Sequence, residues 1–418
     1  MTKALYAQGE PDATAVSTAN TTEYWVFPAA GGNCSMVSST ETQNQVLHKN
    51  AGVFSELCIK IGTNGVAGTS TFTFRKNAAD GNMQLSIPSS STGLFTLADP
   101  SVTDTIAAGD LTTLKSIPGA TTGTIVHRAR SCCFNNTSSS ETISRLGNIN
   151  YPSGANLNTA SAISYEGVLG EFPLNFPSST EANAKCRMRK AGTLRNPGLL
   201  VLTNARTTST TAKIRKNATD TAQVITIPAS TTGWIEQDTP GTTVSVAVGD
   251  DINWSITTGT GTGALRIVIL AIDYVTTDGW FPVGCSTTDS ATQASALTRF
   301  QPLGGFKDTN NTETNVSSIA GGNYRFAELT VLVTANSITG GTTVTLRQNA
   351  ANSALSASIP SGTGLFFDSV NTITTTRADL LAFTMVTGAG TSINIKNIIM
   401  WGQEIVLPQT VYVEWEEA

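Results

Sequence analysis

The chain contains Thr71-Phe-Thr-Phe-Arg-Lys-Asn-Ala, followed by Ile87-Pro88, and it repeats this pattern twice more. In every copy, polar and apolar residues alternate up to an Arg, a short polar turn follows, and a second alternating run ends at Ile-Pro. Alternation on both sides of a short turn is typical of a β-hairpin. The further copies keep the spacing from Arg to Pro and are Thr211-Ala-Lys-Ile-Arg-Lys-Asn-Ala with Ile227-Pro228 and Thr343-Val-Thr-Leu-Arg-Gln-Asn-Ala with Ile359-Pro360.

The repeat extends well beyond this hairpin. A shift of 140 residues along the chain aligns Gly109-Asp110 with Gly249-Asp250, and a shift of 132 aligns Arg215 with Arg347. The third copy is the most diverged, because Arg377-Ala378-Asp379 stands where the other copies have Gly-Asp. Repeats of this length are whole domains rather than solenoid turns, whose periods are roughly 20 to 50 residues. The sequence therefore predicts three tandem domains.

The composition favours an all-β fold. Charged residues make up 13% of the 418 residues, well below the usual content, and long runs of helix-forming residues are missing. Short strand-like runs follow one another within a copy, with no helix between them to connect parallel strands. We therefore predict three tandem jelly-roll-like β-sandwich domains of about 135 residues each.

The repeat also predicts domain boundaries. Short apolar clusters at residues 24–28, 171–173 and 279–282 are interpreted as the opening strand of each domain. The expected segments are an N-terminal arm at 1–22, a first sandwich at 23–134, an inter-domain arm at 135–164, a second sandwich at 165–274, a third sandwich at 275–403, and a C-terminal strand with an acidic tail at 404–418.

Two features predict how the domains are arranged. The segment Val411-Tyr-Val-Glu-Trp415 alternates like a strand, and we expect it to pair with another domain or with a partner subunit. Jelly rolls of this type often form trimers, and one chain with three of them imitates a trimer. We therefore expect a compact pseudo-threefold cluster rather than an extended row.

Charge and cysteine content exclude several classes of protein. The net charge is −5, so the chain has no basic field for nucleic acid. We find no apolar run long enough to span a membrane and no secretory signal, so a protein of this kind that acts outside a cell would be assembled in a host cytoplasm and released by lysis. A disulfide framework or a zinc site required by the fold recurs with the fold, but none of the six cysteines recurs. They are interpreted as free thiols with apolar character.

The two histidines give no support for catalysis. His48 aligns with Met188 and His127 with Ile267, so each lies where a sister domain has an apolar residue. A Ser-His-Asp or Cys-His arrangement requires one of these two histidines, and no motif for such a site accompanies them. Repeated acids such as Glu41 could in principle hydrolyse glycosides. A position shared by three diverged domains is, however, better explained by the fold, and we predict neither an enzyme nor a cofactor or metal.

Several other residues recur at equivalent positions. The repeated Arg has two interpretations, a structural ion pair or a contact to an anion or a sugar, and the planar guanidinium favours a carboxylate held at a strand end. Trp234 and Trp254 align with leucine or phenylalanine and are predicted to be packed rather than to stack on sugars. The repeated structural positions are Arg75, Arg215, Arg347, Gly109, Gly249, Asp110, Asp250 and Asp379.

The turn at Gly109-Asp110 and Gly249-Asp250, followed by an apolar strand, resembles the Gly-Asp turn of C1q and tumour-necrosis-factor-like jelly rolls. With the Arg-Lys-Asn and Ile-Pro pattern, it also resembles β-sandwich domains of bacteriophage tail fibres, head fibres and capsid decoration proteins. The resemblance implies a non-enzymatic virion protein on the capsid or tail surface. Its partners would be major capsid or tail subunits.

Two other functions stay open. A carbohydrate-binding adhesin or receptor-binding protein would bind host surface glycans, and it predicts exposed aromatic residues in the loops of one copy. A glycan hydrolase on the same sandwich would carry two facing carboxylates. A homo-oligomer is compatible with all of these functions.

Overall fold

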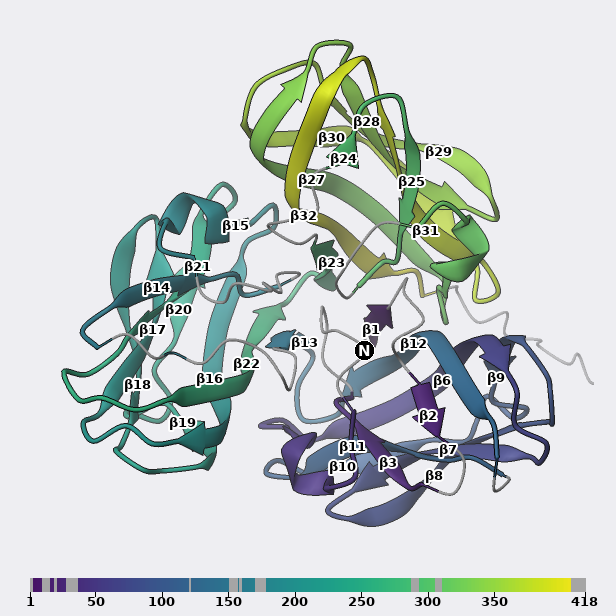
Figure 1. Ribbon diagram of the computed structural model, residues 1–418, viewed down its shortest axis with the longest axis horizontal. Helices are drawn as coiled ribbons and strands as arrows, with labels where there is room; N and C mark the ends of the chain where they lie inside the picture. Colours follow the sequence, from purple (N-terminus) through teal and green to yellow (C-terminus); the bar gives the residue numbers. More distant parts are fainter. Residues whose placement is uncertain are drawn as a thin grey trace, which may run out of the picture.

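The computed structural model confirms the all-β fold, with six antiparallel sheets that pair into three jelly-roll sandwiches. It describes residues 3–9, 16–18, 21–27, 37–119, 122–149, 157, 160–169, 178–286, 293–304 and 310–406. We call the sandwiches lobe 1 (β1 to β12), lobe 2 (β13 to β22) and lobe 3 (β23 to β32). The lobes surround a common centre instead of forming a row, so the clustered arrangement is the one observed (Figure 1).

Lobe 2 shows the topology most clearly. Its inner sheet has the order β13-β22-β16-β19, and its outer sheet has the order β14-β21-β17-β18. The first and last strands are neighbours, which is the jelly-roll arrangement. The elements are β13 (Thr142–Ile149), β14 (Ile163–Glu166), η2 (Glu181–Ala184), β15 (Cys186–Arg187), β16 (Gly192–Asn204), β17 (Thr210–Lys216), β18 (Thr219–Ile227), β19 (Gly233–Glu236), β20 (Val244–Val246), β21 (Asp251–Thr257) and β22 (Leu265–Thr276).

Lobes 1 and 3 repeat this topology with small changes, and in lobe 3 one long strand, β30, replaces the pair that forms β19 and β20 in lobe 2. Lobe 1 consists of β1 (Lys3–Gly9), β2 (Val16–Thr18), β3 (Glu23–Trp25), β4 (Val37–Ser38), η1 (Glu41–Gln43), β5 (Val46–Leu47), β6 (Gly52–Asn64), β7 (Ser70–Lys76), β8 (Ala79–Ile87), β9 (Gly93–Thr96), β10 (Asp104–Ile106), β11 (Leu111–Ile117) and β12 (Thr124–Asn136). Lobe 3 consists of β23 (Trp280–Ser286), β24 (Gln293–Ala294), β25 (Thr298–Gln301), η3 (Glu313–Asn315), β26 (Ser318–Ile319), β27 (Tyr324–Ile338), β28 (Thr342–Gln348), β29 (Ala351–Ile359), β30 (Gly364–Thr375), β31 (Leu380–Thr387) and β32 (Gly390–Glu404).

The repeated stretch forms the predicted hairpin in each lobe: β7 with β8, β17 with β18, and β28 with β29. Its two turn residues have positive φ in all three copies, for example 49° at Asn77 and 63° at Ala78. Positive φ at both central residues defines the type I′ turn, whose twist matches that of the flanking strands. Asn tolerates this conformation, which explains the Asn at the start of each turn.

Two segments expected as arms instead contain sheet strands. Within 1–22, Lys3–Gly9 forms β1 and pairs with β12 along its whole length. Within 135–164, Thr142–Ile149 forms β13 and pairs with β22. The sequence Lys3-Ala-Leu-Tyr-Ala-Gln-Gly does not alternate, because Ala4 to Gly9 are all buried, and the period-2 signal is therefore missing. The domain boundaries themselves stay a prediction.

The expected equivalence of the opening strands is also wrong. Tyr24 and Trp25 belong to β3, which pairs with β11 in an outer sheet. Trp280 belongs to β23, which pairs with β32 in an inner sheet and is therefore the counterpart of β1 and β13. The third cluster, at 171–173, and the strand expected at Val411–Trp415 lie outside the described residues.

The edge strands β1, β13 and β23 meet at the centre, where each contacts the other two (Figure 1). Because they cover one another, the backbone edges of the three inner sheets are not left as templates for aggregation. One hydrophobic core of buried residues runs through all three lobes. No helix in the described part of the chain has the length and apolar character to cross a membrane.

Candidate functional site: clamps within lobes and contacts between them

The repeated Arg forms the same clamp in each lobe. Arg75 Nε donates to Glu41 Oε1 at 2.8 Å, Arg215 Nε donates to Glu181 at 2.8 Å, and Arg347 Nε donates to Glu313 at 2.7 Å. Each guanidinium also bonds the carbonyl oxygen of the second turn residue and a side chain at the start of the next strand, which is Asp80, Asp220 or Asn352. The clamp therefore fastens the hairpin turn to a 3-10 helix.

The charges of this clamp change the pKa values of its members. The hydrogen bond to Glu41 is the main cause that raises the pKa of Arg75 above its usual value. The hydrogen bond to Glu181 does the same for Arg215. The guanidinium side chains of Arg75 and Arg215 are 11% and 17% exposed and are directed at carboxylates of their own lobes. A structural ion pair accounts for this geometry without an external ligand.

The repeated Asp fastens the other side of the same turn. Asn77 Nδ2 donates to Asp110 Oδ1 at 2.6 Å, and Asn217 donates to Asp250 at 2.7 Å. Gly109 and Gly249, with φ of +94° and +93°, provide the left-handed backbone before each Asp.

Asp379 has the same role although Arg377-Ala378 precede it, because Asn349 Nδ2 donates to it at 2.7 Å. The backbone N–H of the residue three positions earlier also donates to the carboxylate in every lobe, at 2.7 Å, 2.8 Å and 2.6 Å. In lobe 2 this backbone bond is the largest cause that lowers the pKa of Asp250.

Both histidines are buried in lobe 1. His48 Nε2 lies 2.8 Å from Thr112 Oγ1, and its ring packs against Phe54. Burial lowers the pKa of His48 to about 3, so the ring is neutral at physiological pH. The ring of His127 lies 4.1 Å from that of Trp25. Both histidines therefore have packing environments.

The cysteines and tryptophans are placed mostly as the sequence predicts. Five free cysteines are buried, namely Cys58, Cys132, Cys133, Cys186 and Cys285; Cys34 lies outside the described residues. Trp254 is buried in the core of lobe 2. Trp234 is half-buried, and its Nε1 donates to the carbonyl oxygen of Gln45 in lobe 1 at 3.1 Å. Among the described residues, no group of His, Cys, Asp or Glu is arranged to hold a metal.

A β-bulge recurs at the inner strand of each lobe, and it marks the contacts between lobes. Glu56, Asn196 and Glu328 occupy it, with φ of 62°, 53° and 57°. In each lobe the bulge lies where the inner-sheet strand (β6, β16 or β27) pairs with the last strand of the lobe (β12, β22 or β32). Two residues of the first strand lie opposite one residue of the second. A bulge re-aims its side chain. Here Glu56 and Glu328 pair with cations of another lobe, whereas Asn196 bonds Asp273 of its own lobe, which accepts from Asn50 of lobe 1.

Lobes 2 and 3 meet through charged groups. Arg189 and Lys190 of lobe 2 pair with the Glu328 carboxylate at 2.9 Å and 3.4 Å. The Arg189 guanidinium also lies over the ring of Phe367, 4.5 Å from its centroid. Among the described residues, Phe367 is the exposed aromatic side chain, and this cation occupies one of its faces.

Lobes 3 and 1 meet around Glu56. Arg377 of lobe 3 forms an ion pair with this carboxylate, and Lys3 lies 3.9 Å from it. Burial raises the pKa of Glu56, and the charges of Arg377 and Lys3 oppose that shift. Nearby, the hydroxyl of Tyr324 lies 3.1 Å from Cys133 Sγ across the same interface.

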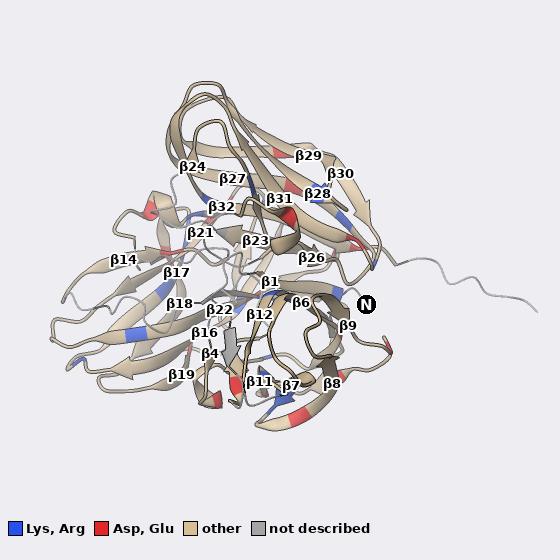
Figure 2. Cartoon of the chain, turned by 45° about the vertical axis from the view of Figure 1, so that its right-hand side comes forward, with Lys and Arg blue, Asp and Glu red and all other residues tan. Residues whose placement is uncertain are grey.

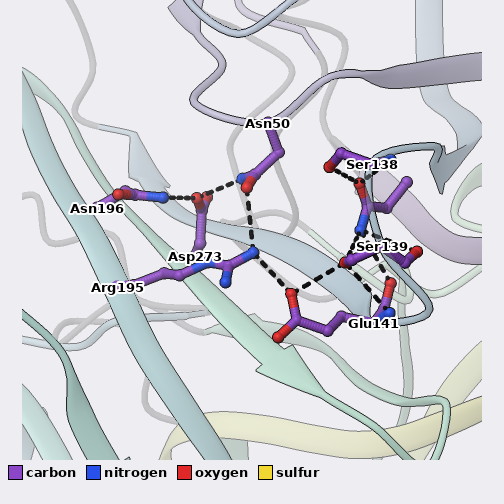
Figure 3. Close-up of polar contacts among 8 residues, drawn as sticks. Asn50, Ser138, Ser139, Glu141, Arg195, Asn196 and Asp273 are labelled. Atoms are coloured by element: carbon purple, nitrogen blue, oxygen red, sulfur yellow. Dashed lines mark hydrogen bonds and ion pairs between the residues drawn. The ribbon is translucent and has the colours of Figure 1, made fainter. Parts of the chain in front are cut away.

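Lobes 1 and 2 meet around Asn50 of lobe 1, which donates to Asp273 and accepts from Arg195 of lobe 2 (Figure 3). Asp273 accepts hydrogen bonds from Arg145 at 2.8 Å, from Asn50 of lobe 1 at 2.7 Å, and from Asn196 at 2.8 Å. The Arg145 and Asp273 side chains are 2% and 1% exposed. Beside them, Lys49 of lobe 1 pairs with Glu236 at 2.8 Å. An apolar cluster joins the same two lobes and contains Val26, Val46, Leu200, Val268, Ile269 and Ala271.

The sequence analysis missed these interface residues. The alignment does place Glu56, Asn196 and Glu328 at one repeated position, but a bulge occupied by Glu has no local signal, because positive φ usually indicates Gly or Asn. The ion pair between Arg145 and Asp273 was hidden because β13 lies in a segment expected to be an arm.

Comparisons with known proteins add little to this geometry. No family model matches the sequence, and neither does any curated protein. One similar solved structure is described as the triple jelly roll fold and turret assembly in an archaeal virus, with 13% identity, a TM-score of 0.17, and coverage of 96% of this chain and 90% of that chain. A second, of Sulfolobus Turreted Icosahedral Virus, has 14% identity, a TM-score of 0.16, and coverage of 86% and 82%. TM-scores this low carry no argument about function.

Proposed function

We propose that this chain is a non-enzymatic virion structural protein, located on the particle surface as a capsid decoration or cement protein or as part of a fibre. The observation that carries the proposal is the closed three-lobed body with one continuous core. Such a body is a rigid unit that presents three different outer surfaces, which suits attachment to neighbouring subunits.

The surface is consistent with this function. Charged residues are sparse and scattered over the lobes (Figure 2), and most of the repeated ones are engaged in clamps. The titratable groups singled out in the sequence have structural partners: the His48 ring contacts the hydroxyl of Thr112, and the three repeated Asp residues accept from the Asn at each hairpin turn. Major capsid or tail subunits are the proposed partners.

The test is a composition measurement on purified particles. Virus particles from the source of this sequence are banded in a density gradient, stripped of loosely bound protein with salt, and analysed by quantitative mass spectrometry. We expect the chain in a fixed ratio to the major capsid protein. Its presence only in the unassembled soluble fraction would contradict the proposal.

A glycan array with the purified chain distinguishes the adhesin alternative. A structural protein gives no saturable signal on any glycan. Specific binding that is lost in Phe367→Ala would favour the adhesin, because Phe367 is the exposed aromatic residue of the described chain.

A further inference from the structure

The three interfaces between lobes differ at one repeated position. At the bulge, lobes 1 and 3 have a Glu that faces cations, whereas lobe 2 has Asn196. The Asn196 side chain is directed to Asp273 instead. The interface between lobes 1 and 2 therefore has no carboxylate from the bulge position.

The cation that faces this position is nevertheless present. His48 and Met188 make the same pair of backbone bonds to their Gly-Asp turns, so Lys49 is the counterpart of Arg189. Arg189 binds the Glu328 carboxylate at 2.9 Å. Lys49 instead lines a cavity of about 60 Å³ between lobes 1 and 2, together with Arg145, Asn196, Gly198 and Gln237, and its ammonium group pairs with Glu236 at the cavity rim.

The buried Arg145 has unused hydrogen-bonding capacity beside this cavity. Its Nη1 donates to the carbonyl oxygen of Asn196 and to Asp273, both at 2.8 Å. Its Nε is buried and has no hydrogen-bond partner among the described residues, and the same is true of Gln237 Oε1. Because this Nε has no accessible surface, the nitrogen available to the cavity is Nη2, which lies 3.6 Å from the place of a Cβ at Gly198 and for which no hydrogen bond is found among the described residues.

Neither Arg145 nor Gly198 is required by the fold. Strand pairing places Leu5 and Pro282 at the position of Arg145 in the other lobes. Pairing with β9 in lobe 1, β19 in lobe 2 and β30 in lobe 3 places Cys58 and Thr330 at the position of Gly198. Of the three lobes, lobe 2 alone has an Arg and a Gly at this pair of positions.

We propose that this cavity binds a small oxyanion, a free carboxylate or phosphate, held by Nη2 of Arg145 with Lys49 opposite. The anion takes the place that the bulge carboxylate occupies in the other two interfaces. A cavity of about 60 Å³ exceeds the room that one water molecule needs, roughly 10 to 15 Å³, and it admits only a small anion.

The test is isothermal titration calorimetry of the full chain with sodium phosphate and, separately, sodium acetate, at constant ionic strength. Gly198→Ala is the central variant. A Cβ at this position would lie 3.5 Å from Trp234 and 3.6 Å from Arg145 Nη2, which are ordinary contacts, so the variant is expected to fold while its methyl group covers Nη2.

We expect saturable binding of at least one anion by the native chain and binding weakened about tenfold or more in Gly198→Ala. Glu236→Gln should bind more tightly, because a nearby negative charge is removed. Arg189→Gln, a control at the other interface of lobe 2, should bind as the native chain does. Saturation with neither anion, or equal binding by the native chain and Gly198→Ala with native-like melting, would overturn the proposal.

Discussion

The Arg-to-Glu contact at each hairpin is the same three times, whereas no two interfaces between lobes are alike. Arg75, Arg215 and Arg347 reach a Glu at 2.8, 2.8 and 2.7 Å. At the interfaces, the bulge residue is a Glu that faces two cations, an Asn that turns to a buried Asp, or a Glu shared with the N-terminal strand. The residues that stabilise each jelly roll are therefore repeated in all three lobes, whereas the contacts that join one lobe to the next differ at each interface.

This difference has a consequence for assembly. Three identical jelly rolls would form a symmetric trimer with three equal interfaces. Unequal interfaces give each lobe one matching neighbour, because a wrong pairing would oppose like charges or leave a buried polar group without a partner. The order of the lobes around the centre is thus specified by polar contacts as well as by chain connectivity.

The largest effect is expected from breaking the buried group between lobes 1 and 2. Asp273→Ala leaves Arg145, Asn50 and Asn196 without their shared acceptor, and it should lower the free energy of unfolding by about 3 to 5 kcal/mol. Cys133→Ala is the matched control, because strand pairing places Cys133 at the same position in lobe 1. It should cost only about 1 kcal/mol. If urea titrations show that both variants lose the same free energy of unfolding, the buried polar group does not stabilise this interface more than an ordinary core residue does.

The clamps should give a smaller and repeated loss. Arg75→Ala or Arg215→Ala leaves partly buried carboxylates unpaired, at a cost of about 3 kcal/mol in that lobe. Arg347→Ala should cost less, because Asn352 stands where the others have Asp80 and Asp220. Calorimetric melting of the three single variants measures these losses of stability. Unchanged melting in all three would reopen the view that these arginines bind an external ligand.

The pH dependence distinguishes lobe 1 from lobe 2 at one site. Burial lowers the pKa of His48 in the folded chain to about 3. As pH drops below about 6.5, the imidazole therefore takes up a proton in the unfolded chain but not in the folded chain, and the free energy of unfolding falls. Between pH 7 and pH 5 this group alone should remove about 2 kcal/mol. His48→Met, which copies Met188 of lobe 2, should lack this loss. Identical urea midpoints against pH for both proteins would refute this account of the ring.

The smallest effect is expected at the interface between lobes 2 and 3. Glu328→Gln removes the pairs with Arg189 and Lys190, whose side chains are partly exposed, and it should cost about 1 kcal/mol. Salt screens such pairs, so the difference from the native chain should shrink as sodium chloride is raised. A loss that is independent of salt would mean that packing, rather than charge, governs this contact.

Much of the fold could be predicted from the sequence, because the hairpin of each lobe has a period of two, an Asn at its turn and a fixed spacing to Ile-Pro. The strands at the centre could not. The side chains of β1 are buried on both faces, so Lys3-Ala-Leu-Tyr lacks alternation, and its place in the sheet depends on pairing with β12, more than a hundred residues away. The repeated Arg and Asp could be found by alignment. The interface residues could not be found in this way, because their contacts differ from one interface to the next and alignment of the copies detects only shared features.

Small-angle X-ray scattering of the full chain tests the central claim most directly. If the three lobes form one closed body around a shared core, the radius of gyration should be about 22 Å, the value for a compact particle of this length, with a single-peaked distance distribution. A markedly larger radius with the long tail of a rod would contradict the account.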